Sequence, residues 1–280
     1  MNASENQWKV LPDEFLEVQL LARRTFGLDI KAGKEALVTA RLNRRMRAIG
    51  VNEVRQYLRF VRGDATGREL LHLVDALTTN FTSFRREAAH FELLKTTIVD
   101  ELRCTSEIRI WSAGCSSGEE PYSVLFELIE ELGVDSASRV KILASDICGK
   151  VLEQARRAVY PLEKLKEMPV GWRRFLERGS GEWAGHFRVS KVWRNLVDFQ
   201  RINLMEPLGQ SARFNVIFCR NVMIYFDRAT QEDLVRRLAE CLMPGGWLLI
   251  GHSEGLSGLN SGLNYIQPAT YRSPGGNTGR

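Results

Sequence analysis

Residue types that bind metals or form disulfides are scarce in this chain. Of its 280 residues, four are histidine and five are cysteine, and no two cysteines have C-x-x-C spacing. The histidines do not cluster with them. An odd number of scattered cysteines is typical of reduced thiols in the cytoplasm rather than of a disulfide framework or a zinc site. We therefore expect no metal.

Export and membrane signals are also lacking. The start M-N-A-S-E-N-Q-W-K has no apolar core, and no window approaches the roughly 18 apolar residues of a membrane span. We expect a globular cytoplasmic protein without direct membrane insertion. A hydrophobic content of 44% allows an ordinary core in one or two domains. The net charge of +5 fits an acidic or anionic partner, whether nucleic acid, a membrane surface or an acidic protein helix.

Residues 108–123, I-R-I-W-S-A-G-C-S-S-G-E-E-P-Y-S, predict a buried strand, a turn of small residues and a helix start. At the carboxyl edge of a parallel sheet, such a turn lets the backbone approach a bound cofactor closely. The turn has neither the G-x-G-x-x-G nor the G-x-x-x-x-G-K-[ST] spacing, which disfavours pyrophosphate and triphosphate ligands. This pattern favours S-adenosylmethionine.

A second apolar strand, predicted over residues 140–145, is followed directly by Asp146. An acid at this place accepts both ribose hydroxyls in adenosine-binding βαβ units. The alternative is that Asp146 only caps a helix that starts near Gly149. The glycine turn upstream favours the ribose interpretation.

The chain divides into a helical N-terminal domain, residues 1–80, and an α/β domain, residues 81–280. Apolar residues recur at helical spacing from 13 to about 76. From 107 onward, predicted strands alternate with helices, which predicts a parallel sheet with helices on both faces. These strands cover residues 108–113, 140–145, 197–202, 214–219 and 246–251.

Between about 160 and 196 the alternation breaks. Two short apolar segments, 187–189 and 192–194, predict a hairpin there, and we interpret the whole stretch as an inserted subdomain. The tail 273–280 is rich in turn residues, and we expect it to be disordered.

Three polar segments lie where a pocket is expected. T-T-N-F-T-S-F-R-R-E at 78–87 either lines a cleft or begins a helix capped by Thr82 or Ser83. Asn203 follows the third strand, where an adenine edge would lie, but a lone Asn is often a turn former. Asn221 follows the fourth strand, in a loop whose apolar residues would pack into the core.

Together these motifs resemble the CheR family of chemotaxis receptor methyltransferases. The resemblance covers almost the whole chain and depends on T-T-N-F-T-S-F-R-R-E, W-S-A-G-C-S-S-G-E-E-P-Y-S, A-S-D-I, C-R-N-V-M-I-Y-F-D and G-H-S-E in this order. It implies an all-helical N-terminal domain followed by a class I S-adenosylmethionine-dependent methyltransferase domain, a Rossmann-like α/β sheet with a small inserted β-subdomain. It also implies methyl transfer from S-adenosyl-L-methionine to glutamates on the cytoplasmic helices of methyl-accepting chemoreceptors, with S-adenosyl-L-homocysteine as product.

The resemblance also implies which residues contact the cofactor. Arg86 would hold the methionine carboxylate, Glu119 the amino group and Asp146 the ribose. Gly114 and Ser117 in the cofactor turn, and E-W-A-G in the insert, depart from the family pattern. The full set implied is Asn80, Thr82, Arg86, Glu119, Asp146, Asn203, Leu204, Asn221 and Val222.

No catalytic base is expected for this chemistry. A glutamate with an ordinary pKa of about 4.3 is already ionised at neutral pH, so the enzyme only has to align the reactants. Tyr225 is a candidate to face the sulfonium with its ring, although an aromatic in an apolar loop often only packs.

Two surfaces are candidates for receptor docking. Lys34, Arg41 and Arg44 fall along one flank of an N-terminal helix, where acidic receptor helices would bind; the alternative is an ordinary solvated flank. The R-G-S-G turn at 178–181 resembles the corresponding turn of family members that bind a receptor C-terminal peptide. The alternative is that the hairpin in the insert only covers a sheet edge.

Two other functions are compatible with a basic, cofactor-binding chain. One is a nucleic-acid methyltransferase, but the N/D-P-P-Y/F turn usual for base amines is replaced here by Asn221-Val-Met-Ile-Tyr. The other is a module that senses the cofactor without catalysis.

Overall fold

The computed structural model describes residues 8–207 and 213–275, and the chain forms two compact units. The first unit contains the described residues up to Thr79 together with Tyr225–Thr230, and the second contains the rest. The segment 225–230 thus groups with the helices, although it lies in the range that the sequence assigns to the α/β domain. Of the tail expected to be disordered, residues 276–280 lie outside the described residues.

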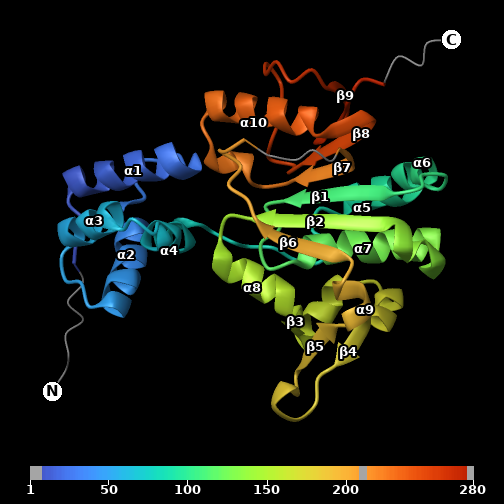
Figure 1. The fold of residues 1–280 in the computed structure, drawn as a ribbon, viewed down its shortest axis with the longest axis horizontal. Helices are drawn as coiled ribbons and strands as arrows, with labels where there is room; N and C mark the ends of the chain where they lie inside the picture. Colours follow the sequence, from blue (N-terminus) through green and yellow to red (C-terminus); the bar gives the residue numbers. More distant parts are fainter. Residues whose placement is uncertain (1–7, 208–212, 276–280) are drawn as a thin grey trace. The chain divides into compact units, whose positions relative to one another are not determined.

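Helices dominate the first unit. Its core contains Val18, Leu42, Met46 and Tyr57, all fully buried. Leu42 and Met46 are four residues apart and therefore share one helix face. The helices are α1 (Pro12–Phe26), α2 (Glu35–Ile49), α3 (Val54–Gly63) and α4 (Arg68–Leu77) (Figure 1).

A sheet of strand order β6-β2-β1-β7-β8-β10-β9 forms the centre of the second unit (Figure 1). The strands from β6 to β8 pair in parallel, and β10 is antiparallel to β8 and to β9. Because the chain winds from β1 outward through β2 to β6 and then returns to β7, the carboxyl ends of β1 and β7 flank a topological switch point, where ligand crevices form. The predicted parallel sheet is confirmed. The strands are β1 (Ile108–Ala113), β2 (Val140–Asp146), β6 (Val197–Arg201), β7 (Phe214–Cys219), β8 (Leu242–Ile250), β9 (Asn264–Gln267) and β10 (Thr270–Arg272).

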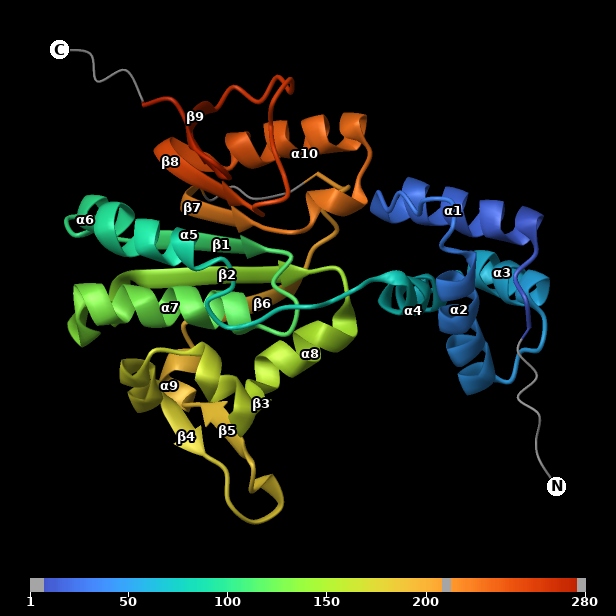
Figure 2. The same ribbon diagram turned by 180° about the vertical axis from the view of Figure 1, so that it is seen from behind.

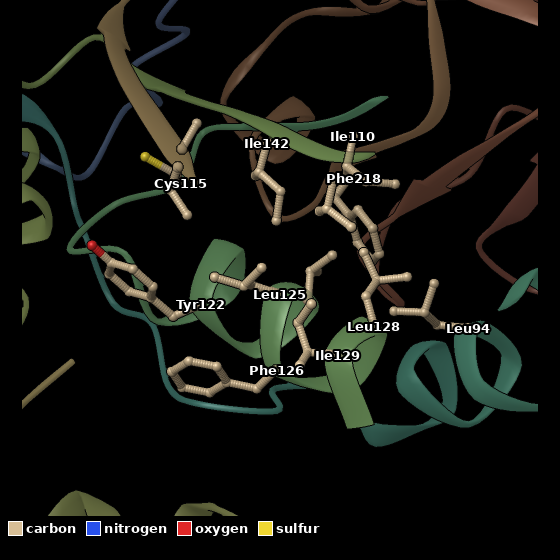
Figure 3. Close-up of a cluster of buried hydrophobic side chains, with 14 of the residues drawn as sticks. Leu94, Ile110, Cys115, Tyr122, Leu125, Phe126, Leu128, Ile129, Ile142 and Phe218 are labelled. Carbon is tan, nitrogen blue, oxygen red and sulfur yellow. The ribbon is translucent and has the colours of Figure 1, made fainter. Parts of the chain in front are cut away.

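Helices pack on this sheet through its apolar side chains. Figure 3 shows Leu125 and Ile129 of α7 in one cluster with Ile110 of β1 and Phe218 of β7. Trp111, which points to the opposite face of β1, is also fully buried, so both faces of the sheet are covered. The helical segments are α5 (Ala88–Leu93), the π-helical η1 (Leu94–Ile98), α6 (Val99–Leu102), α7 (Glu119–Leu132), η2 (Val134–Arg139), α8 (Gly149–Arg157), η6 (Met223–Tyr225) and α10 (Arg228–Glu240).

The inserted subdomain, residues 159–194, carries a three-stranded antiparallel sheet of order β3-β5-β4 (Figures 1 and 2). The predicted hairpin partner 192–194 is wrong, because these residues belong to helix α9 and strand β5 pairs with β3 and β4 instead. Ser190 and Lys191 do not supply the positive φ that a two-residue hairpin turn requires. The elements are β3 (Val159–Pro161), η3 (Leu162–Glu167), η4 (Val170–Phe175), β4 (Leu176–Arg178), η5 (Gly181–Trp183), β5 (His186–Val189) and α9 (Lys191–Arg194).

Candidate functional site

Asp146 fixes the turn after β1 to the end of β2. Its Oδ2 accepts the backbone N–H of Ser116 at 2.9 Å, and its Oδ1 accepts that of Cys148 at 2.9 Å. The second bond, just before α8, agrees with the alternative that Asp146 supports a helix start. The acid is 9% exposed and lies at the carboxyl end of its strand.

Two glycines make the turn possible. Gly114 has φ +88°, and a Cβ on it would lie 2.3 Å from Cγ2 of Val222. Gly118 has φ +95°, and a Cβ there would lie 2.9 Å from Cβ of Ala155 and 3.0 Å from the hydroxyl of Tyr160. Any side chain would be strained in this conformation and would also clash. The first contact places the loop after β7 directly against the turn after β1, at the switch point.

The segment before α5 lies against the same turn. The carbonyl of Asn80 accepts the hydroxyl of Ser116 at 3.1 Å, and its Nδ2 contacts Sγ of Cys148 at 3.4 Å. Asn80 and Asp146 are therefore brought together, because both bind Ser116 and Cys148. Arg86 donates to the carbonyl of Phe81 at 2.9 Å, and its guanidinium lies 5.6 Å from the centre of that ring.

The alternative that this segment begins a capped helix is wrong. Helix α5 begins at Ala88 with Glu87 at the cap position, and neither Thr82 nor Ser83 caps it. The helix cannot start earlier because the backbone of Glu87 has a φ of +57°, which is not a right-handed helical conformation.

Glu119 is a buried acid with two partners. It is 2% exposed; its Oε1 accepts Nζ of Lys164 at 2.7 Å, and its Oε2 accepts the hydroxyl of Ser117 at 2.6 Å. The same Nζ is 3.5 Å from the carbonyl of Thr82. Lys164, on the inserted subdomain, thus brings Thr82 and Glu119 together. The sequence analysis assigned no role to this lysine.

The loop after β7 is held by acids. Asn221 has φ +58°; its N–H donates to Glu254 at 2.9 Å, and its Nδ2 donates to Glu87 at 3.3 Å. Val222 packs against Gly114, as described above. The Val222 contact places this loop beside the turn after β1. Cofactor contacts from Asn221 and Val222 stay predictions.

Asn203 forms a turn after β6. Its Oδ1 accepts the N–H of Met205 at 3.1 Å, and its Nδ2 donates to Glu206 at 3.1 Å. The preceding residue, Ile202, donates to the carbonyl of Asp146 at 3.3 Å, so this turn begins beside the acid. Leu204 is buried. Cofactor contacts from Asn203 and Leu204 stay predictions.

A buried charge network behind these residues was missed by the sequence analysis. The Arg220 guanidinium donates to Glu120 at 3.0 Å, to Glu87 at 3.0 Å and to the carbonyl of Arg86. Burial alone would raise the pKa of Glu87, but Arg220 and the hydrogen bonds from His252 and Asn221 together outweigh it, so the pKa is lowered. For Glu120 burial prevails and raises the pKa. The sequence shows only an arginine directly after an apolar strand, and that pattern does not reveal whether the guanidinium is buried among acidic partners.

One group of possible metal ligands lies among the described residues. Donor atoms of Glu87, His90 and His252 lie within 4.8 Å of one another. Burial, and then Arg220, lower the pKa of His90 to about 4. The Arg220 guanidinium is already 3.0 Å from Glu87 and would repel a metal cation. We therefore assign no metal to this group.

The remaining predicted residues lie in the first unit. Tyr225 donates its hydroxyl to the carbonyl of Thr79 at 3.4 Å, and a role for its ring stays a prediction. Arg41 donates to the carbonyl of Leu77 and to the Thr79 hydroxyl, and burial lowers the pKa of Arg41. Arg41 thus fastens the end of α4 to α2. Lys34 and Arg44 are exposed.

A doubly wound sheet with a glycine turn after β1 and a buried acid at the end of β2 defines a protein that binds an adenosine-containing cofactor. Residues 80–271 match the family described as CheR methyltransferase, SAM binding domain, and residues 13–78 match the CheR methyltransferase, all-alpha domain. The chain belongs to the CheR methyltransferase family. It is an S-adenosylmethionine-dependent methyltransferase, and the predicted family, fold class and cofactor are confirmed.

Curated relatives share this assignment over nearly their whole length. The chain is 43% identical over 244 residues to chemotaxis protein methyltransferase 2 of Pseudomonas aeruginosa, covering 86% of each chain. It is 42% identical over 243 residues to the chemotaxis protein methyltransferase of Salmonella typhimurium, covering 86% of this chain and 83% of the relative. The corresponding protein of Borreliella burgdorferi is 36% identical over 285 residues, or 97% and 99% of the two chains. Within the described residues, no helix is both long and apolar enough to cross a bilayer.

Proposed function

We propose that this enzyme methylates glutamate side chains on the cytoplasmic helices of methyl-accepting chemoreceptors, forming glutamate methyl esters in the cytoplasm. The relatives named chemotaxis protein methyltransferases support this substrate. The observation that carries the proposal is a pair of buried acids, Asp146 and Glu119, on either side of a glycine turn at the switch point. This pair fits a cofactor that presents a ribose diol and an ammonium group.

The cofactor supplies a methyl group activated by a sulfonium. The residues of the chain bind and orient it: Asp146 takes the ribose hydroxyls, Glu119 the amino group and Arg86 the carboxylate. Asn80, Thr82, Asn203, Leu204, Asn221 and Val222 complete the pocket in this proposal. Because the attacking glutamate is already ionised, the site needs no base, and alignment alone can lower the barrier by roughly 7–11 kcal/mol.

The receptor helix would dock on the exposed face of α2. Lys34 and Arg44 point positive charge outward there, and Leu37, seven residues before Arg44 on the same face, is 45% exposed. This combination fits an acidic amphipathic helix. Arg41 contributes less than the sequence suggested, because its guanidinium already bonds α4.

A second contact is proposed for the receptor C-terminus. Strands β3 and β4 are the two edges of the small sheet in the inserted subdomain, and an extended peptide can add to such an edge. Arg178 on β4 is exposed, and Trp183 beyond it is 54% exposed, so an acidic and aromatic peptide would find complementary groups. Titration of such a peptide, followed by fluorescence anisotropy, should show micromolar binding; no change would remove this contact.

Transfer of a tritiated methyl group tests the function. Incubation with a receptor cytoplasmic fragment should yield label that is released by mild base, as methyl esters are, and a fragment with its methyl-accepting glutamates changed to alanine should stay unlabelled. Base-stable label on nucleic acid would instead establish a nucleic-acid methyltransferase. Binding of S-adenosylhomocysteine without label on either substrate would indicate a cofactor sensor.

A further inference from the structure

Arg220 joins the segments that form the proposed cofactor pocket. Its side chain is 2% exposed and donates to Glu120 at the start of α7, to Glu87 before α5 and to the carbonyl of Arg86. Each acceptor lies in or beside a residue proposed for the pocket: one is the carbonyl of Arg86 itself, and the others are carboxylates of residues next to Arg86 and Glu119. Glu120 follows Glu119, and Asn221 follows Arg220 and binds Glu87 through its Nδ2 at 3.3 Å.

Backbone strain surrounds this guanidinium. Arg85, Glu87 and Asn221 have φ values of +54°, +57° and +58°, a region that residues with a side chain rarely adopt. Such conformations persist only where the surrounding structure fixes them, and they cluster at functional sites. Arg220 bonds directly to Glu87, and Glu87 in turn accepts the Nδ2 of Asn221. Glu254 accepts the backbone N–H of Asn221 at 2.9 Å and shares in holding it.

Glu120 is itself oriented by a further bond. Its Oε1 accepts the hydroxyl of Ser112 at 2.7 Å, while its Oε2 accepts Arg220, so both oxygens are assigned. The network contains two carboxylates and one guanidinium, all buried or nearly so, and is therefore rigid.

We propose that Arg220 is a positioning residue for methyl transfer, whose guanidinium fork aligns the methionine half of the cofactor by fixing Arg86 and Asn221. This inference relies on the proposed function. The adenosine half is assigned to Asp146, whose bonds to Ser116 and Cys148 do not involve Arg220. Arg220 therefore acts on the alignment of the reacting atoms more than on the binding of the nucleoside.

The test variant is Arg220→Lys, which keeps the positive charge and loses the fork. A misplacement of about 1 Å can slow a reaction about 100-fold, so kcat for receptor methylation should fall by about that factor. Calorimetry should show unchanged binding of 5′-methylthioadenosine, which lacks the amino acid, and S-adenosylhomocysteine should bind up to about tenfold more weakly. A role in folding alone would weaken both ligands equally.

Two further variants keep the test decisive. Arg139→Lys is the matched control, because Arg139 donates to the carbonyls of Leu102, Arg103 and Thr105 outside the site, and it should keep wild-type kcat. Ser112→Ala removes only one small hydroxyl from the network and should lower kcat about three- to tenfold even where Arg220→Lys does not fold.

Three results would overturn the inference. The first is a wild-type kcat in Arg220→Lys, and the second is an equal loss of affinity for 5′-methylthioadenosine and S-adenosylhomocysteine in that variant. The third is a wild-type kcat in Ser112→Ala when Arg220→Lys is unfolded. Failure of the wild-type enzyme to label any receptor fragment would instead overturn the proposed function, and the two failures are thus distinguished.

Discussion

Replacing Asp146 tests the assignment of the ribose site, and the choice of substitution matters. In Asp146→Ala, the N–H groups of Ser116 and Cys148 both lose their acceptor. Each unsatisfied buried amide costs about 1–3 kcal/mol, so the fold loses about 2–6 kcal/mol, a large part of the 5–15 kcal/mol typical of a domain. Weak cofactor binding in this variant would then reflect unfolding as much as a lost contact.

Asp146→Asn is the sharper variant. It keeps one acceptor oxygen, so only one of the two amides is left unsatisfied, and the fold should survive with a lower melting temperature. Hydrogen bonds to a charged acceptor contribute about 1.5–3 kcal/mol each. Losing the charge and one acceptor should weaken the binding of S-adenosylhomocysteine by about 2–3 kcal/mol, or about 30- to 150-fold in Kd.

Isothermal titration calorimetry measures this loss, with a thermal melt of each variant. Asp198→Asn is the matched control, since Asp198 is exposed on the neighbouring strand β6 and undergoes the same loss of charge. It should bind the ligand like the wild type. A Kd for Asp146→Asn within twofold of the wild type, with the protein folded, would refute the ribose assignment.

Three more changes have defined outcomes. Gly114→Ala should lower the melting temperature and abolish S-adenosylhomocysteine binding, since its Cβ would collide with the loop after β7; normal binding would show that the loop can move away. Burial lowers the pKa of His90 to about 4 from an ordinary 6.5, so its contribution to the free energy of unfolding is complete above pH 6.5. This contribution is lost as the pH falls from 6.5 to 4, by up to roughly 3 kcal/mol. Urea unfolding of His90→Leu should lack this part of the pH dependence. The double change Lys34→Glu with Arg44→Glu should reduce receptor methylation at low salt severalfold without affecting S-adenosylhomocysteine binding. The change Arg41→Glu should also lower the melting temperature. Wild-type methylation rates in the double variant would show that this face of α2 is ordinary solvated surface.

The parts of the fold that depend on local pattern were predictable. Strands β1 and β7 begin and end where the apolar runs do, because both are buried and bounded by small or polar residues. The place of Asp146 at the end of β2 was predictable for the same reason, because this acid directly follows an apolar run. The helix over 191–194 was not found, because three or four residues carry too little periodicity to distinguish a helical turn from a strand.

Contacts between distant segments were not predictable in this way. Arg220 and Glu87 are 133 positions apart, and only the fold shows that they meet in a buried pair. The sequence shows an arginine after a strand, but a surface arginine there would look the same. The same holds for Arg41: its helical spacing with Arg44 indicates a shared flank, and only the packing of α4 shows that its guanidinium bonds to Leu77 and Thr79.

The inserted subdomain also makes contacts with distant segments, and these contacts decide which variants can test its function. Lys164 binds Glu119, Glu167 accepts the N–H of Phe84 at 2.9 Å, and Tyr160 donates to the carbonyl of Ser117 at 2.8 Å, so the first residues of the subdomain pack against the turn after β1 and the segments beside it. Deleting the subdomain would therefore disturb the proposed cofactor pocket as well as the proposed peptide site. A change confined to the loop between β4 and β5, residues 179–185, leaves these three contacts in place, and only such a change can separate peptide binding from methyl transfer.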